Sequence, residues 1–217
     1  MFKSINLFRK SVAVNQYPLP VQSVTDVVFR DACQSIIDLV STDITFEYTE
    51  VGVPESGKAI HKMYHDACAG GTFKVFSGAN DAANLYFSPE TNLAYRAVHD
   101  LDHASAYAEG RGTTKMADEL YLNCLMAKRV YQYALANGYE RKQALLAFFE
   151  VYHDTVGQVH YYFEHKDFCA DQKALTTQLV SECRGCKAVL ANDLMTASIE
   201  MQRMLRECGV PFKIMGV

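Results

Sequence analysis

The chain has 217 residues, 49% of them hydrophobic and 21% charged, with a formal net charge of −4. This length suits one well-filled core, so we expect a single domain over residues 23–217, preceded by an arm over residues 1–22. Lysine and arginine are dispersed, which argues against direct nucleic-acid binding. Without a membrane-length apolar run or a signal-peptide core, we expect a cytoplasmic protein without a membrane span.

The first third of the chain alternates between helical and extended patterns. Apolar residues at helical spacing predict a helix that begins at residue 23 or 25 and ends near residue 40. The period then changes to two over residues 44–48, which predicts a strand, and a short helix follows Pro54. FKVF at 73–76 and LYFS at 85–88 flank a turn-rich stretch, so we expect an antiparallel β-hairpin in a small sheet between residues 44 and 88.

The rest of the chain has helical spacing. Ser88 and Pro89 form a strong helix start, and further helices are predicted from residue 113 or 114 to 137, over 141–165 and over 171–208, the last with a break or kink at Gly185. The expected fold class is therefore mainly α (α+β): a bundle of about five to six helices with one small sheet.

The stretch AYRAVHDLDHASAYAE, residues 94–109, concentrates polar chemistry on one predicted helix. It places His99, Asp100, Asp102 and His103 within two turns. Residues four apart lie one above the other on a helix, so His99 and His103 share a face and can bind one cation. Because neutral imidazole is a common ligand of catalytic metals, we interpret this segment as a metal site.

The predicted 141–165 helix is the second concentration of chemistry. Glu150, His153, Gly157, His160 and Glu164 fall on one face at steps of three and four. Glu150 and His153 form a carboxylate-x-x-His pair, and a second such pair lies in the first segment. That arrangement on two helices is used by di-iron helical bundles, in which other helices supply single carboxylates.

Glu119 is a candidate for such a single carboxylate, because it lies on an otherwise apolar helix face, where an unpaired charge is costly. We therefore predict a metal-binding helical domain that holds one or two divalent transition-metal ions, zinc or iron, with manganese as a further option. A small-molecule substrate would react by hydrolysis or oxidation, between which the sequence does not choose. The predicted metal ligands are His99, His103, Glu119, Glu150 and His153, and the predicted groups for ligand orientation or proton transfer are Asp100 and His160.

The segment NLAYRAVHDLDH, followed by a glycine-containing turn and Glu119, resembles the HDxxH…E signature of the helical zinc protein of coenzyme Q biosynthesis. It is also similar to small phage proteins that share an N-x-x-(F/Y)-R-A-x-H-D-x-x-H block. This resemblance covers about thirty residues. It implies His99, Asp100, His103 and Glu119 as the metal set, although the spacing to Glu119 is about one helical turn longer here.

A second resemblance, to HD-domain phosphodiesterases, depends on the histidine pair of HKMYH, residues 61–65, and on HDLDH, residues 99–103. It implies a metal-dependent phosphohydrolase in which His65, His99, Asp100 and a later carboxylate such as Asp154 or Asp171 hold the ion, with His61 as proton donor. The strands expected between the two motifs depart from the helical connection of that family.

A non-enzymatic alternative stays open, in which the chain is a viral or accessory interaction protein with a structural metal. The long apolar stripe of the C-terminal helix would also suit a homo-oligomer contact. Cys183 and Cys186 form a lone CxxC that is either redox-active or half of a zinc site, and the seven cysteines fit a reducing compartment.

Overall fold

The computed structural model describes residues 21–211, over which it contains eight helices and two strands. The predicted arm, residues 1–22, lies outside the described residues except for its last two, which begin the first helix. The elements are α1 (Val21–Val40), β1 (Thr45–Thr49), α2 (Gly57–Cys68), β2 (Thr72–Phe76), α3 (Pro89–Ala108), α4 (Met116–Ala136), α5 (Arg141–His165), α6 (Gln172–Glu182), α7 (Arg184–Leu190) and α8 (Leu194–Glu207).

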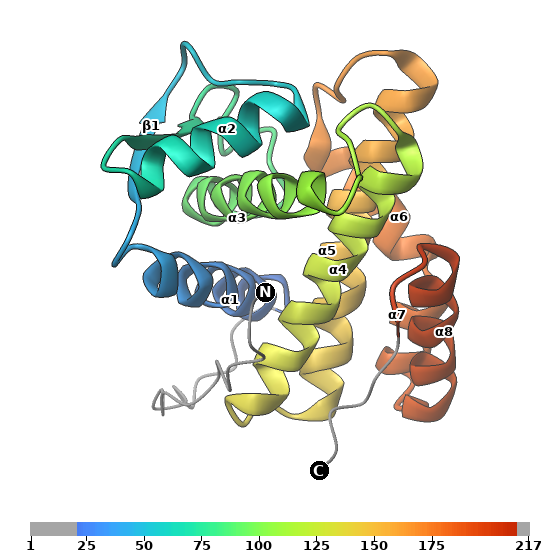
Figure 1. Cartoon of the computed structure of the whole chain (residues 1–217). Coiled ribbons are helices and arrows are strands. Elements are labelled where there is room, and N and C mark those ends of the chain that lie inside the picture. Colours follow the sequence, from blue (N-terminus) through green and yellow to red (C-terminus); the bar gives the residue numbers. More distant parts are fainter. Residues whose placement is uncertain (1–20, 212–217) are drawn as a thin grey trace.

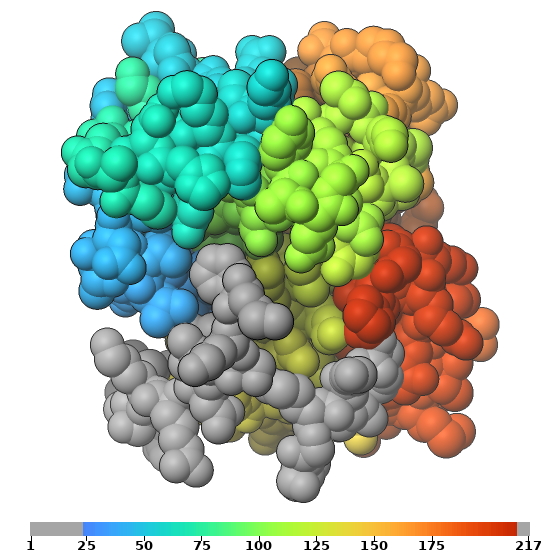
Figure 2. Space-filling view, viewed as in Figure 1, coloured from blue at the N-terminus to red at the C-terminus, as the bar shows by residue number. Residues whose placement is uncertain are grey.

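The packing centres on α4 and α5, which run side by side through the molecule (Figure 1). On one side α1 packs against α3, α4 and α5, and α2 covers α3; on the other side α6, α7 and α8 pack against α5. In the space-filling view α2 and α8 lie at opposite edges of the visible face (Figure 2). The helix α5 therefore separates an N-terminal layer from a C-terminal layer.

The mainly helical class is confirmed, but the helix count was too low. The stretch 171–208, expected as one kinked helix, forms three. It leaves the helical path at Cys183, near the predicted break at Gly185, and again at Asn192, whose φ of +61° lies in the left-handed region. No described helix is long and apolar enough to cross a membrane.

The predicted antiparallel hairpin was wrong. β1 and β2 form a two-stranded parallel sheet in the register Thr45 to Thr72. Parallel neighbours need a crossover connection, and α2 provides it. Residues 85–88 form no strand; Leu85, Tyr86 and Phe87 are instead buried in the core on the way to α3.

The start of α3 is fixed where the sequence predicted it. The Ser88 hydroxyl oxygen accepts the N–H of Thr91 at 3.3 Å, and Pro89 occupies the first helical turn. Asp26 of α1 accepts both the backbone N–H and the hydroxyl of Ser88, at 2.9 and 3.1 Å. These hydrogen bonds fix α3, the helix that carries His99 and His103, to α1.

Candidate metal centre

Two imidazoles project from one face of α3 toward α4. The opposite, apolar face of the helix is buried, with Ala97 and Val98 fully inaccessible. His99 and His103 lie one turn apart, with their Nε2 atoms 3.1 Å from each other and their ring centroids 4.5 Å apart. Packing of the apolar face therefore determines where both imidazoles point.

Glu119, in the first turn of α4, completes the group. Its Oε2 lies 3.4 Å from His99 Nε2 and its Oε1 lies 3.3 Å from His103 Nε2. Ligand atoms of the three side chains all lie within 4.8 Å of one another, and over residues 21–211 no other cluster of three His, Cys, Asp or Glu does so. The side chains of His99, His103 and Glu119 are 18, 7 and 14% exposed, so the group is largely enclosed but reaches solvent.

The turn between α3 and α4 places Glu119. The carboxylate of Asp118 accepts the backbone N–H of Gly112 at 3.0 Å and pairs with Arg111 at 3.4 Å. Arg111 also lies over the ring of Tyr121, 3.9 Å from its centroid. These contacts fold the connecting loop back onto the start of α4.

The three groups are strongly coupled in charge. Burial alone would raise the pKa of Glu119, but hydrogen bonds with His103 and His99 outweigh it and hold the pKa at about 2. Burial would lower the pKa of His99, but the hydrogen bond and charge of Glu119 raise it. Without a metal the cluster therefore favours a carboxylate beside a protonated imidazole, and a divalent cation would take the place of that proton.

Neighbouring side chains contact the candidate ligands. The Tyr95 ring stacks on His99, and its hydroxyl donates to Asn123 Oδ1. Asn123 in turn donates its amide N–H to the backbone oxygen of Glu119 at 2.9 Å. A path of side chains therefore joins the His99 imidazole on α3 to the backbone of Glu119 on α4.

A second link between α3 and α4 is the ion pair of Asp102 with Arg129, at 2.5 Å. Asp102 directly precedes His103 in the chain. The sequence assigned no site role to Arg129 or to Tyr95. Tyr95 carried a signal, because it lies four residues before His99 and so shares its helix face, whereas the place of Arg129 follows from tertiary packing.

Of the other predicted site residues, Asp100 neighbours this cluster, whereas Glu150, His153 and His160 lie apart from it. Asp100 follows His99 on α3, and burial raises its pKa to about 6 against the opposing charges of both imidazoles. Glu150 is buried at 4% exposure, while His153 and His160 line a groove on the far side of α5. None of these residues joins the cluster, so the predicted five-ligand set is not brought together.

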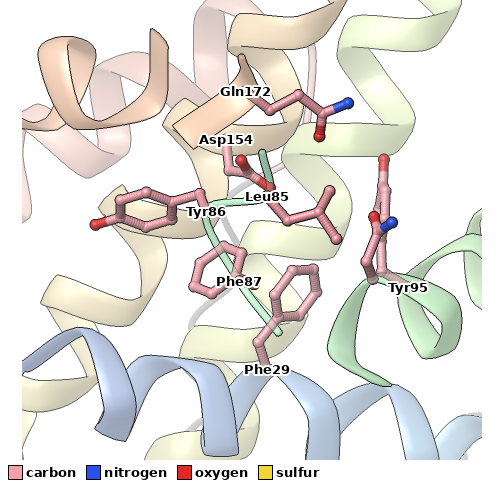
Figure 3. Close-up of a pocket in the computed structure, with 8 residues that line it drawn as sticks. Phe29, Leu85, Tyr86, Phe87, Tyr95, Asp154 and Gln172 are labelled. Atoms are coloured by element: carbon pink, nitrogen blue, oxygen red, sulfur yellow. The ribbon is translucent and has the colours of Figure 1, made fainter. Parts of the chain in front are cut away.

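Three residues of the phosphodiesterase resemblance, His61, His65 and Asp154, bond elsewhere. His65 Nε2 lies 3.1 Å from His61 Nε2, and His61 Nδ1 lies 2.7 Å from the backbone oxygen of Ala104. Asp154 on α5 accepts the hydroxyl of Thr176 at 2.8 Å. Asp154, Tyr95 and Gln172 line a small cavity of about 10 Å³, room for about one water molecule (Figure 3). Neither His65 nor Asp154 joins the His99 cluster.

Comparisons with protein-family models, with curated proteins and with solved structures each found no match for this chain. The resemblances of the HDxxH segment therefore stay predictions. What the molecule presents is a helical fold with a two-histidine, one-carboxylate cluster whose donor atoms suit a divalent transition metal.

Proposed function

We propose that the protein is a metal-dependent enzyme that holds one divalent transition-metal ion on His99, His103 and Glu119. The observation that carries this proposal is the convergence of two imidazoles and one carboxylate from α3 and α4 within 4.8 Å. Three protein ligands leave at least one coordination position for water or substrate, as catalytic zinc sites do.

Hydrolysis is the reaction that this surrounding favours. A bound ion would lower the pKa of a coordinated water molecule and polarise a substrate oxygen. Asp100 adjoins His99 and lies in the field of both imidazoles, where its carboxylate would accept the proton that the water loses. Tyr95 and Asn123 would hold the ligands in place. Oxidation with iron uses the same ligand types, so metal identity separates the two reactions.

A structural metal in a non-enzymatic protein is the second candidate, favoured by the low exposure of His103, 7%. The phosphohydrolase alternative has less support, because His65 and Asp154 already bond elsewhere. Thermal melting with and without chelator distinguishes the metalloenzyme from the protein with a structural metal. Removal of a structural ion should cause a large loss of stability, and removal of an ion from an open catalytic site a smaller one.

The test of the site is elemental mass spectrometry on protein purified without an affinity tag. We expect about one equivalent of zinc, iron or manganese in the wild type and its loss in His99→Ala, His103→Ala and Glu119→Gln. Matched controls are His153→Ala and Glu150→Gln, which remove the same side-chain types from the separate α5 face and should retain the metal. A wild type that takes up no metal on reconstitution overturns the proposal, as does equal loss in the controls.

A further inference from the structure

A second group of reactive side chains lies across α5 from the candidate metal centre. Cys183 closes α6 and opens α7, and Cys186 lies one turn further on. The backbone N–H of Cys186 donates to the sulfur of Cys183 at 3.3 Å. Both are free thiols and nearly inaccessible, at 5 and 3% exposure. This is the CxxC of the sequence analysis, held in one compact turn.

Close packing against α5 fixes the position of this turn. A Cβ atom added to Gly185, between the two cysteines, would lie 2.1 Å from the ring of Phe149. The backbone of the CxxC is therefore pressed onto α5 beside Glu150 and His153. The His153 imidazole and the Glu150 carboxylate act electrostatically on this turn, His153 on Cys183 and Glu150 on Cys186.

Glu150 and His153 carry polar atoms that the described structure leaves unsatisfied. Glu150 Oε2 and His153 Nε2 are both buried without a hydrogen-bond partner within residues 21–211. Such groups are uncommon in native interiors and mark candidate sites of chemistry. His153 also lines a groove of about 490 Å³ between α5, α6 and α8, so it connects the thiols to a surface opening.

We propose that Cys183 and Cys186 form a peroxide-reactive dithiol site, with His153 as the proton carrier between the thiols and the groove. Residues three apart on a helix have Cβ atoms about 5–6 Å apart, and a disulfide needs about 3.5–4.5 Å, so a small movement closes the bond. A hydroperoxide suits the site because it is small enough for thiols of such low exposure.

The reaction balances in two steps. The Cys183 thiol gives its proton to His153, its sulfur attacks one peroxide oxygen, the O–O bond breaks, and the leaving hydroxide takes the proton from His153 to form water. The product is a sulfenic acid. The Cys186 thiol then loses its proton, its sulfur displaces the hydroxyl from Cys183, and a second water leaves. Two thiols are oxidised by two electrons while one peroxide is reduced.

The two sulfurs have different roles. The hydrogen bond with Cys186 and the nearby His153 lower the pKa of the Cys183 thiol, whereas the neighbouring Cys183 and burial raise that of Cys186. The thiolate is the nucleophile, so Cys183 attacks and Cys186 resolves. Among the other thiols, Cys68 is exposed, and Cys124 and Cys208 form a second neighbouring pair. They serve as internal comparisons.

The first test treats the full chain with stoichiometric hydrogen peroxide, alkylates it under denaturing conditions and maps the cysteines by mass spectrometry. We expect a Cys183–Cys186 disulfide that dithiothreitol reverses. Cys186→Ser should accumulate a sulfenic acid at Cys183, trapped by dimedone, and Cys183→Ser should form neither product. His153→Gln should slow the reaction by about tenfold or more. Faster oxidation of Cys68, or a Cys124–Cys208 disulfide in its place, overturns the proposal.

Two further measurements keep the interpretation separate from metal chemistry. His99→Ala, which removes a ligand of the proposed metal, should form the same disulfide at the wild-type rate, so this test stands whether or not the metal site exists. A colorimetric zinc assay should find no zinc released from the wild type when its thiols are blocked with a mercurial. Zinc released from wild type but not from Cys183→Ser would make the pair a metal ligand and overturn the redox role.

Discussion

The ring of Tyr95 stacks on the imidazole of His99, with centroids 5.4 Å apart and planes inclined by 28°. The Tyr95 hydroxyl also donates to Asn123, whose amide donates to the backbone oxygen of Glu119. Tyr95 therefore contacts one candidate ligand directly and is linked to the backbone of another through Asn123. We expect Tyr95→Phe to weaken metal binding about tenfold while the fold is kept. Titration with a competing chelator measures this. The double variant with Asn123→Ala should weaken binding no more than either change alone; additive losses would show that the path is not a unit.

Metal affinity should rise with pH. The pKa of His99 is raised, so a proton competes with the ion until the pH exceeds that value. Without metal, the contribution of His99 to folding stability has the opposite pH dependence and falls as pH rises. Stabilisation by protonated His99 is present below about pH 6.5 and lost as pH rises through the raised pKa, and stabilisation by Glu119 is lost as pH falls from about 4.5 toward 2. Denaturation of metal-free wild type and Glu119→Gln at about pH 5.5 and about pH 8.5 checks this. If the stability difference between wild type and Glu119→Gln is the same at both pH values, the predicted pH dependence is wrong.

The Asp102–Arg129 pair should stabilise the α3–α4 contact. The side chains are 13 and 28% exposed, so Arg129→Ala leaves a mostly buried carboxylate unpaired, and we expect a loss of about 2 kcal/mol, between surface and fully buried pairs. The control is Lys62→Ala, which removes an ion pair to Asp66 whose side chains are 76 and 59% exposed, and it should cost less than about 1 kcal/mol. Urea denaturation of both variants measures these losses. Equal losses of stability in the two variants would contradict the prediction.

Two glycines on helices offer a matched comparison of packing. In Gly185→Ala the new methyl group would lie 2.1 Å from the Phe149 ring. Because that ring is buried and cannot move away, we expect the variant to lose about 1–3 kcal/mol of stability. In Gly157→Ala it would meet only the end of the Leu179 side chain, at 2.5 Å, which can rotate into the groove. The higher helix propensity of alanine then offsets the cost, and we expect a change near zero. The melting temperature of Gly185→Ala should therefore be lower than that of Gly157→Ala.

Glu150 should destabilise the fold when it is charged. Burial raises its pKa from 4.5 to about 7, so the charged form is costly in the native state. Glu150→Gln should therefore stabilise the protein by about 2–3 kcal/mol at pH above 8, and the gain should vanish below about pH 4.5, where both side chains are neutral. A gain that does not depend on pH would point to packing instead.

The sequence predicted what depends on local pattern. The bounds of α5, the capped start of α3 and the shared face of His99 and His103 all follow from helical periodicity and end signals. Glu119 was identified because a carboxylate on an apolar helix face requires a partner, and its partners are the two imidazoles.

The fold departs from the sequence prediction where tertiary packing decides. Alternation of apolar and polar residues is the same in parallel and antiparallel strands, so the direction of β2 depended on the crossover by α2. Glu150, His153 and His160 do share one side of α5, as predicted. Spacing along a helix does not reveal how that helix is rotated about its axis, and in the fold His153 and His160 face α6 and α8 rather than α3.

The two imidazoles belong to α3 and the carboxylate to α4, with a seven-residue connection, residues 109–115, between the helices. A bound ion would therefore act as a reversible cross-link between the layer formed by α1 to α3 and the pair α4 and α5. Such a cross-link stabilises the native state in proportion to the logarithm of metal concentration, since the unfolded chain lacks the site. Amide hydrogen exchange in α3 and the first turns of α4 should slow more on metal addition than exchange in α7 and α8, on the far side of α5.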